Sequence, residues 1–544
     1  MARATCRSVT KRSAIQFVGT IRLKKFKSEF SDTISLCPLK SPEPETGKTP
    51  SFINLSLIIN ALNKLPKIKA AHATLTHIPD KLTIRRHDSR KTGSKRNRCR
   101  KFPSSLSGRV HPGESLMRLS RKTALATVSA LLLCASAAQA QSDRSVRIGI
   151  STFLSGAGAV FGVPARDAAE LVAADINRQG GIKGAQVKLT FFDENQGVDN
   201  TVIEYKRLVE SNQVDAMVIG LSSSTCLAVA PVAEQLKMPT LLWDCGTARL
   251  FEEQRYDHVY RTADYTPSNN VAAALYLLKD MPQVKTIAGI NQDYAFGRDN
   301  WAAFKEAVQA LRPDVKFVAE LFPKLGTADY STEISRLSAL RPDVVFTTLW
   351  GGDMNTFVKQ SSSRALFRTS RLVAPNGQSS LEQLGKTFPA NAIVGMRGDS
   401  WAFNPAMRDN AQHRKFVEDF RAKTRAYPSF PAYHMAQALS AVRQALEQRW
   451  DGQPATLKTA LLQGWDGLQL DDYTGKLAIR ADHQAMEGQL YGVSKPAEGQ
   501  PFLTLSRLAL IPPELVSPPV GEKTDDWLRT LKPSLLEQIS IPAE

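Results

Sequence analysis

Residues 155–184 of the chain read SGAGAVFGVPARDAAELVAADINRQGGIKG and open with glycines at positions 156, 158 and 162. The apolar run before them, residues 146–152, has the composition of a buried strand. After the glycines, Ala168, Leu171, Val172 and Ile176 recur at the spacing of one helix face. A glycine-rich turn between a strand and a helix is typical of α/β proteins that hold either a dinucleotide or a small anion.

The rest of the chain repeats this alternation of strand and helix. Further strands are predicted at residues 187–194, 214–221 and 239–244, with amphipathic helices between them. A second series places strands at residues 286–292, 316–323, 342–350 and 370–376, and is followed by a helix at 432–450 and short strands at 475–480 and 488–495. This alternation predicts two α/β units with parallel, doubly wound sheets. The proline-rich segment after residue 511, with one short helix, is expected to lie outside both units.

The formal net charge of +18 belongs to the N-terminal part of the chain. Residues 1–116 contain 24 Lys and Arg against 7 Asp and Glu, whereas residues 141–544 contain 43 basic and 45 acidic residues. Low hydrophobicity combined with high charge favours disorder over a folded domain. A basic arm for nucleic acid is one alternative. We favour an over-extended reading frame whose true start is Met117, and we expect no nucleic-acid partner.

Residues 117–140, MRLSRKTALATVSALLLCASAAQA, have the features of a secretory signal peptide. Three basic residues precede an apolar segment that is too short to span a bilayer, and AQA at 138–140 is a small-x-small cleavage site. We therefore expect a periplasmic protein. Acylation of Cys134 in a lipoprotein signal is the alternative, which Leu133 disfavours because a small residue is expected there.

Motifs of several enzyme classes are missing from this sequence. It contains no H-E-x-x-H, C-x-x-C or G-x-S-x-G pattern. The glycine turn is a weak dinucleotide signal because Pro164 interrupts the start of the helix, and export removes the protein from the cytoplasmic nicotinamide pool. We therefore expect a non-enzymatic protein with no cofactor and no metal site.

Hydroxyl side chains follow two consecutive predicted strands, where each next helix begins. Ser223 and Ser224 come after the strand that ends at Leu221, and Thr247 comes after the strand that ends near Asp244. Free N–H groups at a helix start suit a carboxylate, and open α/β sheets bind ligands beyond the carboxyl ends of their strands. These residues could instead only cap their helices. Two such turns beside aromatic residues favour binding.

Several motifs together resemble the substrate-binding proteins of ABC transporters, of the branched-chain amino acid (leucine-binding) type. The glycine stretch with its GGIKG turn is similar to that family's first strand, loop and helix. The motifs that carry the rest of the resemblance are VDAMVIGLSSSTCLAVAPVAEQLKMPTLL at 214–242, with Ser223, Ala228, Pro231 and Glu234 in place, GINQDYAFG at 289–297 and ADYSTEISRLSALRPDVVF at 328–346. The resemblance covers about residues 144–500.

The resemblance implies a type I periplasmic-binding fold, in which two Rossmann-like lobes are joined by three crossovers and hold the ligand in the cleft between them. The crossovers are expected near residues 261–267, 398–403 and 486–489. Lobe I would comprise residues 144–262 and 399–486, lobe II residues 263–398 and 487–511, and the C-terminal tail residues 512–544. The implied partners of the monomer are a small solute and an inner-membrane permease with a separate cytoplasmic ATPase. A ligand-sensing protein that feeds a signalling partner is the alternative function on this fold.

Carried over residue by residue, the resemblance assigns Ser223 and Thr247 as donors to a solute carboxylate, with Ser224 beside them. It places Cys245 where the family directs a backbone carbonyl toward an ammonium group. Phe161, Phe296 and Trp350 fall where the family commonly has tyrosines or other aromatic residues, although each could be ordinary core.

Asn376 departs from the family pattern. Many amino acid binders of the family carry an acidic residue after Gly-Pro on the second lobe, whereas this chain reads APNG at 374–377. A buried ammonium group would lack a partner there unless Asp244, Asp293 or Asp353 compensates. We therefore expect a small carboxylate with an apolar or aromatic body ahead of a zwitterionic aliphatic amino acid.

Cys226 and Cys245 are the two cysteines beyond the signal peptide. If the strands before them are neighbours, both residues lie at the same edge of the sheet, within bridging distance. An exported protein meets oxidising conditions, so we expect a disulfide between them. Two free buried thiols are the alternative.

Overall fold

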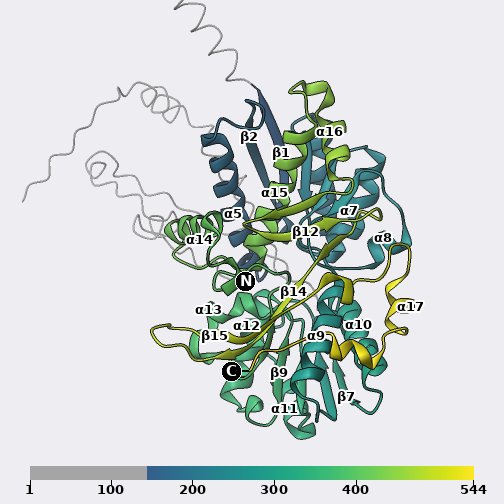
Figure 1. Cartoon of the computed structure of the whole chain (residues 1–544), viewed down its shortest axis with the longest axis vertical. Coiled ribbons are helices and arrows are strands. Elements are labelled where there is room, and N and C mark those ends of the chain that lie inside the picture. The colour runs from purple at the N-terminus through teal and green to yellow at the C-terminus, as the bar shows by residue number, and fades with distance from the viewer. Residues whose placement is uncertain (1–143, 544) are drawn as a thin grey trace, which may run out of the picture. The chain divides into compact units, whose positions relative to one another are not determined.

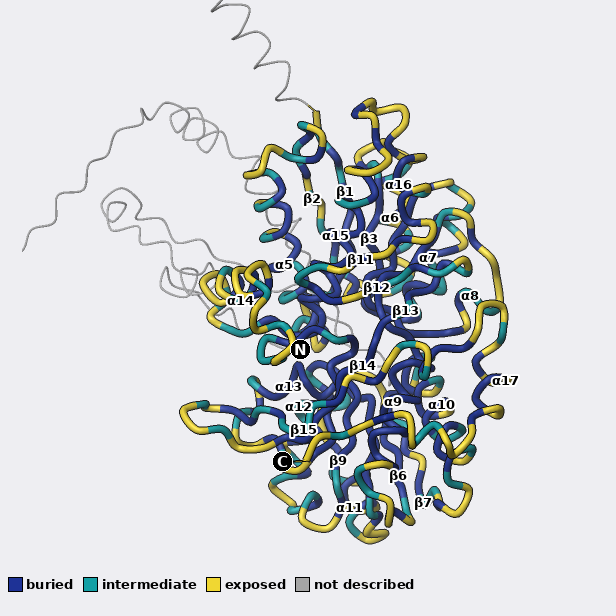
Figure 2. The backbone as a smooth tube through the Cα atoms, viewed as in Figure 1, coloured by how far each residue is buried: buried dark blue, intermediate teal, exposed yellow. Residues whose placement is uncertain are grey.

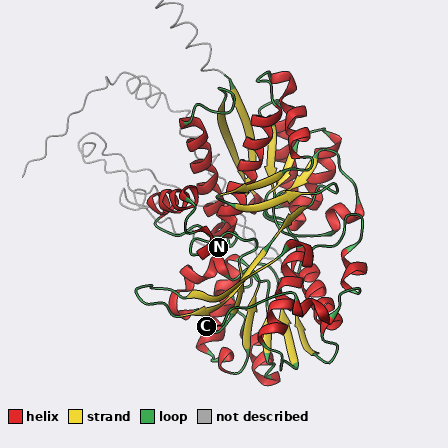
Figure 3. Cartoon of the chain, in the orientation of Figure 1, coloured by secondary structure: helices red, strands yellow, loops and turns green. Residues whose placement is uncertain are grey.

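A computed structural model describes residues 144–543 of the chain. The expected signal peptide and the segment before it lie outside these described residues. Within them, no helix is both long and apolar enough to cross a membrane. Two large sheets flanked by helices, and a third small sheet, make up the fold (Figures 1 and 3).

The first large sheet is parallel and has the strand order β2-β1-β3-β4-β5. Its strands are β1 (Ser145–Thr152), β2 (Gln186–Asp193), β3 (Ala216–Ile219), β4 (Thr240–Leu242) and β5 (Val259–Arg261), and the helices between them are α5 (Ala159–Arg178), α6 (Val198–Glu210), α7 (Ser223–Gln235) and α8 (Arg249–Glu253). Side chains of a strand alternate between the two faces of a sheet. In β3, Val218 accordingly joins the core under α5, while Met217 and Ile219 join the core under α6 and α7.

The second large sheet is mixed and has the order β15-β14-β10-β9-β8-β6-β7. Its parallel strands are β6 (Thr286–Ile290), β7 (Lys316–Leu321), β8 (Val344–Phe346), β9 (Arg371–Ala374) and β10 (Ile393–Gly395), and the antiparallel ones are β14 (Gln489–Lys495) and β15 (Thr504–Ile511). Helices α9 (Thr266–Asp280) and α10 (Ala295–Leu311) contribute to the core on one face, and α11 (Ser331–Leu340), α12 (Gly351–Ser363) and α13 (Gln378–Leu384) to the core on the other. The central strands, such as β3 and β9, are buried, whereas the edge strands β2, β7 and β15 are partly exposed (Figure 2).

Three crossovers join the two lobes, as the resemblance implies. The chain leaves the first sheet after β5 and enters α9, returns after β10, and leaves again from β13 into β14. Between the second and third crossovers lie α14 (Ala411–Thr424), α15 (Phe430–Arg449), α16 (Leu457–Trp465) and the small antiparallel sheet of β11 (Gln469–Asp472), β12 (Gly475–Ile479) and β13 (Ala485–Glu487). The expected fold of two α/β lobes is confirmed.

The segment after β15 packs on the second lobe. It contains α17 (Thr524–Leu528) and two short 3-10 helices, Pro513–Leu515 and Pro533–Glu537. Val516 and Leu528 are fully buried in the core that α9 and α10 share. The same segment reaches the first lobe, because the Thr524 hydroxyl donates to Glu252 of α8 over 2.5 Å. This C-terminal segment is drawn in yellow in Figure 1.

Candidate functional site

The turn after β3 is held by a buried carboxylate. Glu194 accepts hydrogen bonds from the backbone N–H groups of Leu221 and Ser222, at 3.0 and 3.2 Å, and from the Ser151 hydroxyl at 2.7 Å. Burial raises the pKa of Glu194. Gly220, with a φ of +90°, makes the turn possible, since a Cβ there would lie 2.1 Å from the sulfur of Cys226.

Helix α7 begins on this turn at Ser223. The Ser223 side chain is buried, and its Oγ has no hydrogen-bond partner within residues 144–543. Ser224, the next residue, is half-buried. A buried hydroxyl normally finds a partner, so the Ser223 hydroxyl retains an unused donor close to the first N–H groups of the helix.

The turn after β4 carries the other predicted polar residues. Cys245 is fully buried and forms a disulfide with Cys226, with their Cα atoms 6.5 Å apart. The Thr247 hydroxyl donates to Asp299 of α10 over 2.9 Å, so it already bonds across the cleft to the second lobe. Burial raises the pKa of Asp299.

A small pocket lies between the lobes, just beyond the ends of these strands. It is lined by Phe161, Leu221, Asp244, Tyr294, Phe296, Trp350, Asn376 and Arg397. The structure thus brings together four of the predicted site residues, Phe161, Phe296, Trp350 and Asn376. Ser223, Ser224, Cys245 and Thr247 lie on the adjoining turns and not among its lining residues. The cavity is only about 10 Å³, because the aromatic rings fill the space.

The aromatic wall is continuous across both lobes. The rings of Phe161 and Trp350 lie 5.5 Å apart, and Phe161 meets Phe430 of α15 edge-on at 4.9 Å. Trp350 also donates its indole N–H to the Tyr294 hydroxyl over 2.8 Å. The lobes touch directly beside it, where the Gly352 N–H donates to the Ala157 carbonyl at 3.1 Å.

Arg397 is a lining residue that the sequence did not single out. Its side chain is 4% exposed, and it lies 2.5 Å from Asp244 and 2.8 Å from Asp264. The guanidinium also lies over the rings of Phe296 and Phe430, at 5.9 and 5.2 Å. Its backbone is left-handed, with a φ of +49°, directly before the second crossover. Arg397 falls in no predicted helix or strand. The one feature of the sequence that could have indicated its role is a charged residue next to a predicted crossover.

His434 of α15 completes the charged cluster. Its Nδ1 lies 2.6 Å from Asp244 Oδ1 and its Nε2 lies 2.6 Å from the Arg397 carbonyl. Both partner atoms are acceptors, so the imidazole satisfies both contacts when it carries a proton on each ring nitrogen. Sequence periodicity places this histidine in a helix but gives no sign of its role.

The acids considered as partners for an ammonium group have different surroundings. Asp244 lines the pocket. Asp293 pairs with Arg298 and is 40% exposed, and Asp353 is bonded to Gln292 and to the Gly326 N–H. Asn376 donates to the Thr348 carbonyl at 3.1 Å and accepts from Asn269 at 3.4 Å. Asp244 is therefore the acid that can meet a solute in this pocket.

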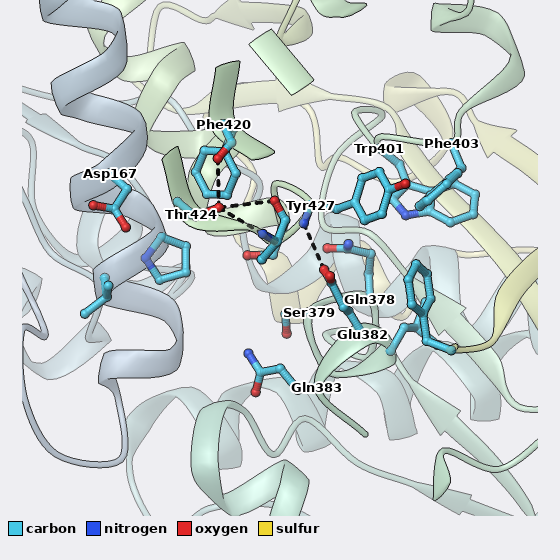
Figure 4. A pocket seen from close by; sticks show the side chains of 16 residues that line it. Asp167, Gln378, Ser379, Glu382, Gln383, Trp401, Phe403, Phe420, Thr424 and Tyr427 are labelled. Carbon is cyan, nitrogen blue, oxygen red and sulfur yellow. Dashed lines mark hydrogen bonds between the residues drawn. The ribbon is translucent and has the colours of Figure 1, made fainter. Parts of the chain in front are cut away.

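A second pocket, larger than the one between the strand ends, has a volume of about 360 Å³ (Figure 4). It is bounded by α5, α13, the end of α14 and the second crossover, with Trp401, Phe403 and Tyr427 among its aromatic residues. The Glu382 carboxylate in its wall accepts from the Tyr427 N–H at 2.9 Å. None of the predicted site residues lines it.

Comparison with known proteins identifies the family to which this fold belongs. The family model for periplasmic binding proteins matches residues 145–499, well over half of the chain. The chain belongs to the periplasmic binding protein family. This membership implies a small-molecule ligand and a periplasmic location, and the class is one of non-enzymatic transport proteins.

Among curated relatives, the Leu/Ile/Val-binding protein homolog 4 of Brucella melitensis is 24% identical over 374 residues, which cover 66% of this chain and 86% of the relative. Solved structures share the fold. A Rhodopseudomonas palustris solute-binding protein in complex with 3,4-dihydroxybenzoic acid has a TM-score of 0.58 at 20% identity, covering 66% of this chain and 96% of the other. A Streptococcus pneumoniae branched-chain amino acid binding protein in complex with isoleucine has a TM-score of 0.56 at 16% identity, covering 68% of this chain and 100% of the other.

Proposed function

We propose that this periplasmic binding protein captures a small carboxylate with an aromatic or apolar body and presents it to an ABC permease. The observation that carries the proposal is the buried, unpartnered hydroxyl of Ser223 at the start of α7, beside an aromatic pocket. A helix start offers N–H groups and a partial positive charge, which suit a carboxylate. Ser224, the Cys245 carbonyl and Thr247 complete the proposed site on the two turns.

The pocket wall supports an apolar or aromatic solute body. Phe161, Phe296 and Trp350 present rings to the cavity, and Asn376 stands where many amino acid binders of the family have an acid. Aromatic walls favour ring stacking, while an amide cannot neutralise an ammonium group. The complexes of fold neighbours with benzoate and with 3,4-dihydroxybenzoic acid support the same solute class.

Binding requires the lobes to separate and close again. A cavity of about 10 Å³ has no room for a benzoate-sized molecule, so the rings of Phe161 and Trp350 must move apart first. The Thr247–Asp299 hydrogen bond would break in the same step, which frees the Thr247 hydroxyl for the solute. Hinge motion of this kind is the usual response of two-lobed binding proteins.

The proposed partners are an inner-membrane permease and a separate cytoplasmic ATPase, and the proposed working form is a monomer. The protein would act in the periplasm after removal of its signal peptide at residues 117–140. Nucleic acid has no place in this function, because the chain from residue 141 onward is nearly neutral.

A thermal-shift screen of the mature protein tests the proposal. The panel pairs each amino acid with its deaminated acid: phenylalanine with 3-phenylpropanoate, and leucine with 4-methylpentanoate. It also contains benzoate as a shorter aromatic acid. A ligand present at 100 times its Kd stabilises the folded state by about 2.7 kcal/mol. We expect the deaminated acids to raise the melting temperature more than their amino acid partners. Tight binding of leucine or valine without binding of the deaminated acids would contradict the proposed solute class.

A further inference from the structure

Only one of the two carboxylate oxygens of Asp244 accepts hydrogen bonds. Oδ1 accepts from Arg397 at 2.5 Å and from His434 at 2.6 Å. Oδ2 is buried and has no hydrogen-bond partner in the described part of the chain. The side chain is 1% exposed and lines the pocket between the lobes. A buried carboxylate oxygen without a donor is unfavourable, so a solute that supplies one is stabilised.

The charge of Asp244 is already balanced. Arg397 and the doubly protonated His434 supply two positive charges against Asp244 and Asp264, which pairs with Arg397 at 2.8 Å. Among the other ionisable groups near the cluster, burial raises the pKa of Glu487 well above its usual range, so Glu487 adds no negative charge. Burial raises the pKa of Asp399 only to about 6, so Asp399 is largely ionised at neutral pH and adds one negative charge. Arg261, buried beside Asp264, adds one positive charge, which offsets it.

We infer that Asp244 Oδ2 determines specificity by accepting a hydrogen bond from a neutral hydroxyl group of the solute. An ammonium group brought to the same oxygen would add a positive charge to a cluster that has no negative charge in excess, and its burial would be costly. A hydroxyl satisfies the oxygen without adding charge. The preferred solute is thus a hydroxylated aromatic or apolar carboxylate. This inference rests on the proposed function, since the carboxylate still binds at the turns after β3 and β4.

The first test compares matched solutes on the wild-type mature protein by calorimetry. The probes are 3- and 4-hydroxybenzoate, the corresponding methoxybenzoates, which keep the oxygen but lack the donor, and 4-(aminomethyl)benzoate, which carries an ammonium group. We expect one hydroxybenzoate to bind about 10- to 100-fold more tightly than its methoxy analogue, the usual range for a hydrogen bond to a charged acceptor. The ammonium probe should bind more weakly than that hydroxybenzoate.

Two variants assign this preference to the cluster. Asp244→Asn should reduce the hydroxy-to-methoxy ratio to below about 3-fold. His434→Gln removes one positive charge but keeps a donor toward Asp244, so it should improve the ammonium probe about 10-fold relative to the hydroxybenzoate. Asp293→Asn, a surface acid paired with Arg298, is the control and should change neither ratio. If Asp244→Asn does not fold, the wild-type ratio and His434→Gln decide the matter.

The outcomes separate this inference from the proposed function. If no carboxylate probe binds the wild-type protein, the proposed function is wrong and the inference goes with it. If benzoates bind but the wild-type hydroxy-to-methoxy ratio is below 3-fold, or is the same in Asp244→Asn, the role of Asp244 is wrong and the carboxylate-binding function stands. An ammonium probe that His434→Gln leaves unimproved would overturn the charge-balance argument.

Discussion

The Ser223 hydroxyl sits buried at the start of α7 without a partner in residues 144–543, and this makes a direct prediction. Ser223→Ala should weaken carboxylate binding by about 1.5–3 kcal/mol, the range for a hydrogen bond to a charged group. The free protein should lose little stability, because no internal hydrogen bond is removed. Ser222→Ala on the same turn is the control and should change the Kd less than 3-fold. Equal effects of the two variants in calorimetry would contradict the assigned role of Ser223.

His413 makes stability depend on pH. Its ring is buried against Tyr433, with Nε2 2.9 Å from the phenol oxygen, and burial lowers its pKa to about 4. The unfolded chain takes up a proton near pH 6.5 that the folded chain refuses, so stability falls as the pH drops below 6.5. The loss from this group between pH 7.5 and 5 should be about 2 kcal/mol.

Urea denaturation at the two pH values checks this effect. His413→Gln keeps a polar side chain but cannot titrate, so its stability should fall by about 2 kcal/mol less than that of the wild type over the same interval. Identical pH dependence in both proteins would show that folding does not lower the pKa of His413.

Part of the pocket could be predicted from the sequence. Phe161, Phe296, Trp350 and Asn376 follow strands or open helices, and parallel strands bring such positions to one edge of a sheet. Arg397 and His434 were missed for a physical reason. Each meets Asp244 from a position more than 150 residues away, and a long-range buried ion pair leaves no periodic pattern in the sequence.

At the scale of the elements, the disulfide ties the start of α7 to the turn after β4. Cys226 and Cys245 are 19 residues apart, and closing a loop of that length contributes about 3 kcal/mol through the unfolded state. The double variant Cys226→Ser, Cys245→Ser should lose about that much stability in urea denaturation. Thiol counting on the unfolded, unreduced protein gives an independent answer, since two free thiols would refute the bridge.

The C-terminal segment is expected to stabilise the second lobe. Leu528 of α17 is fully buried in the core of that lobe, whereas Val520 in the same segment is 55% exposed. Leu528→Ala should destabilise the protein by about 2–5 kcal/mol, while Val520→Ala should change stability by less than about 0.5 kcal/mol. Equal melting temperatures for the two variants would mean that the segment does not pack on the lobe in solution.

The packing of this C-terminal segment could not be predicted from its proline-rich sequence. Prolines at 512, 513, 518 and 519 break any helical or strand period, so the sequence suggested a tail outside both units. Trp527 and Leu528 are among the few apolar residues of this segment that could have indicated burial. In the structure they join the core to which α9 and α10 contribute, and both helices lie far earlier in the chain.

For the whole molecule, alternation of strand and helix was enough to predict two α/β lobes. The longer strands, such as β1, β2 and β6, lie where apolar runs predicted them. The three-residue strands β5 and β10 were not predicted, because three residues carry no measurable period and, unlike the equally short β4 and β8, they lie in no longer predicted strand. Each directly precedes a crossover, so the positions where the chain passes between the lobes are difficult to predict from the sequence.

The central claim is that the cleft recognises the carboxylate of its solute, and calorimetry of an acid against its amide tests it most directly. The mature protein would be titrated with the best-binding benzoate from the thermal-shift screen and then with the matching benzamide, which has nearly the same shape and no charge. The helix start and the Ser223 hydroxyl favour the anion, so the acid should bind at least 10-fold more tightly than the amide. An amide that binds as tightly as the acid would contradict the account.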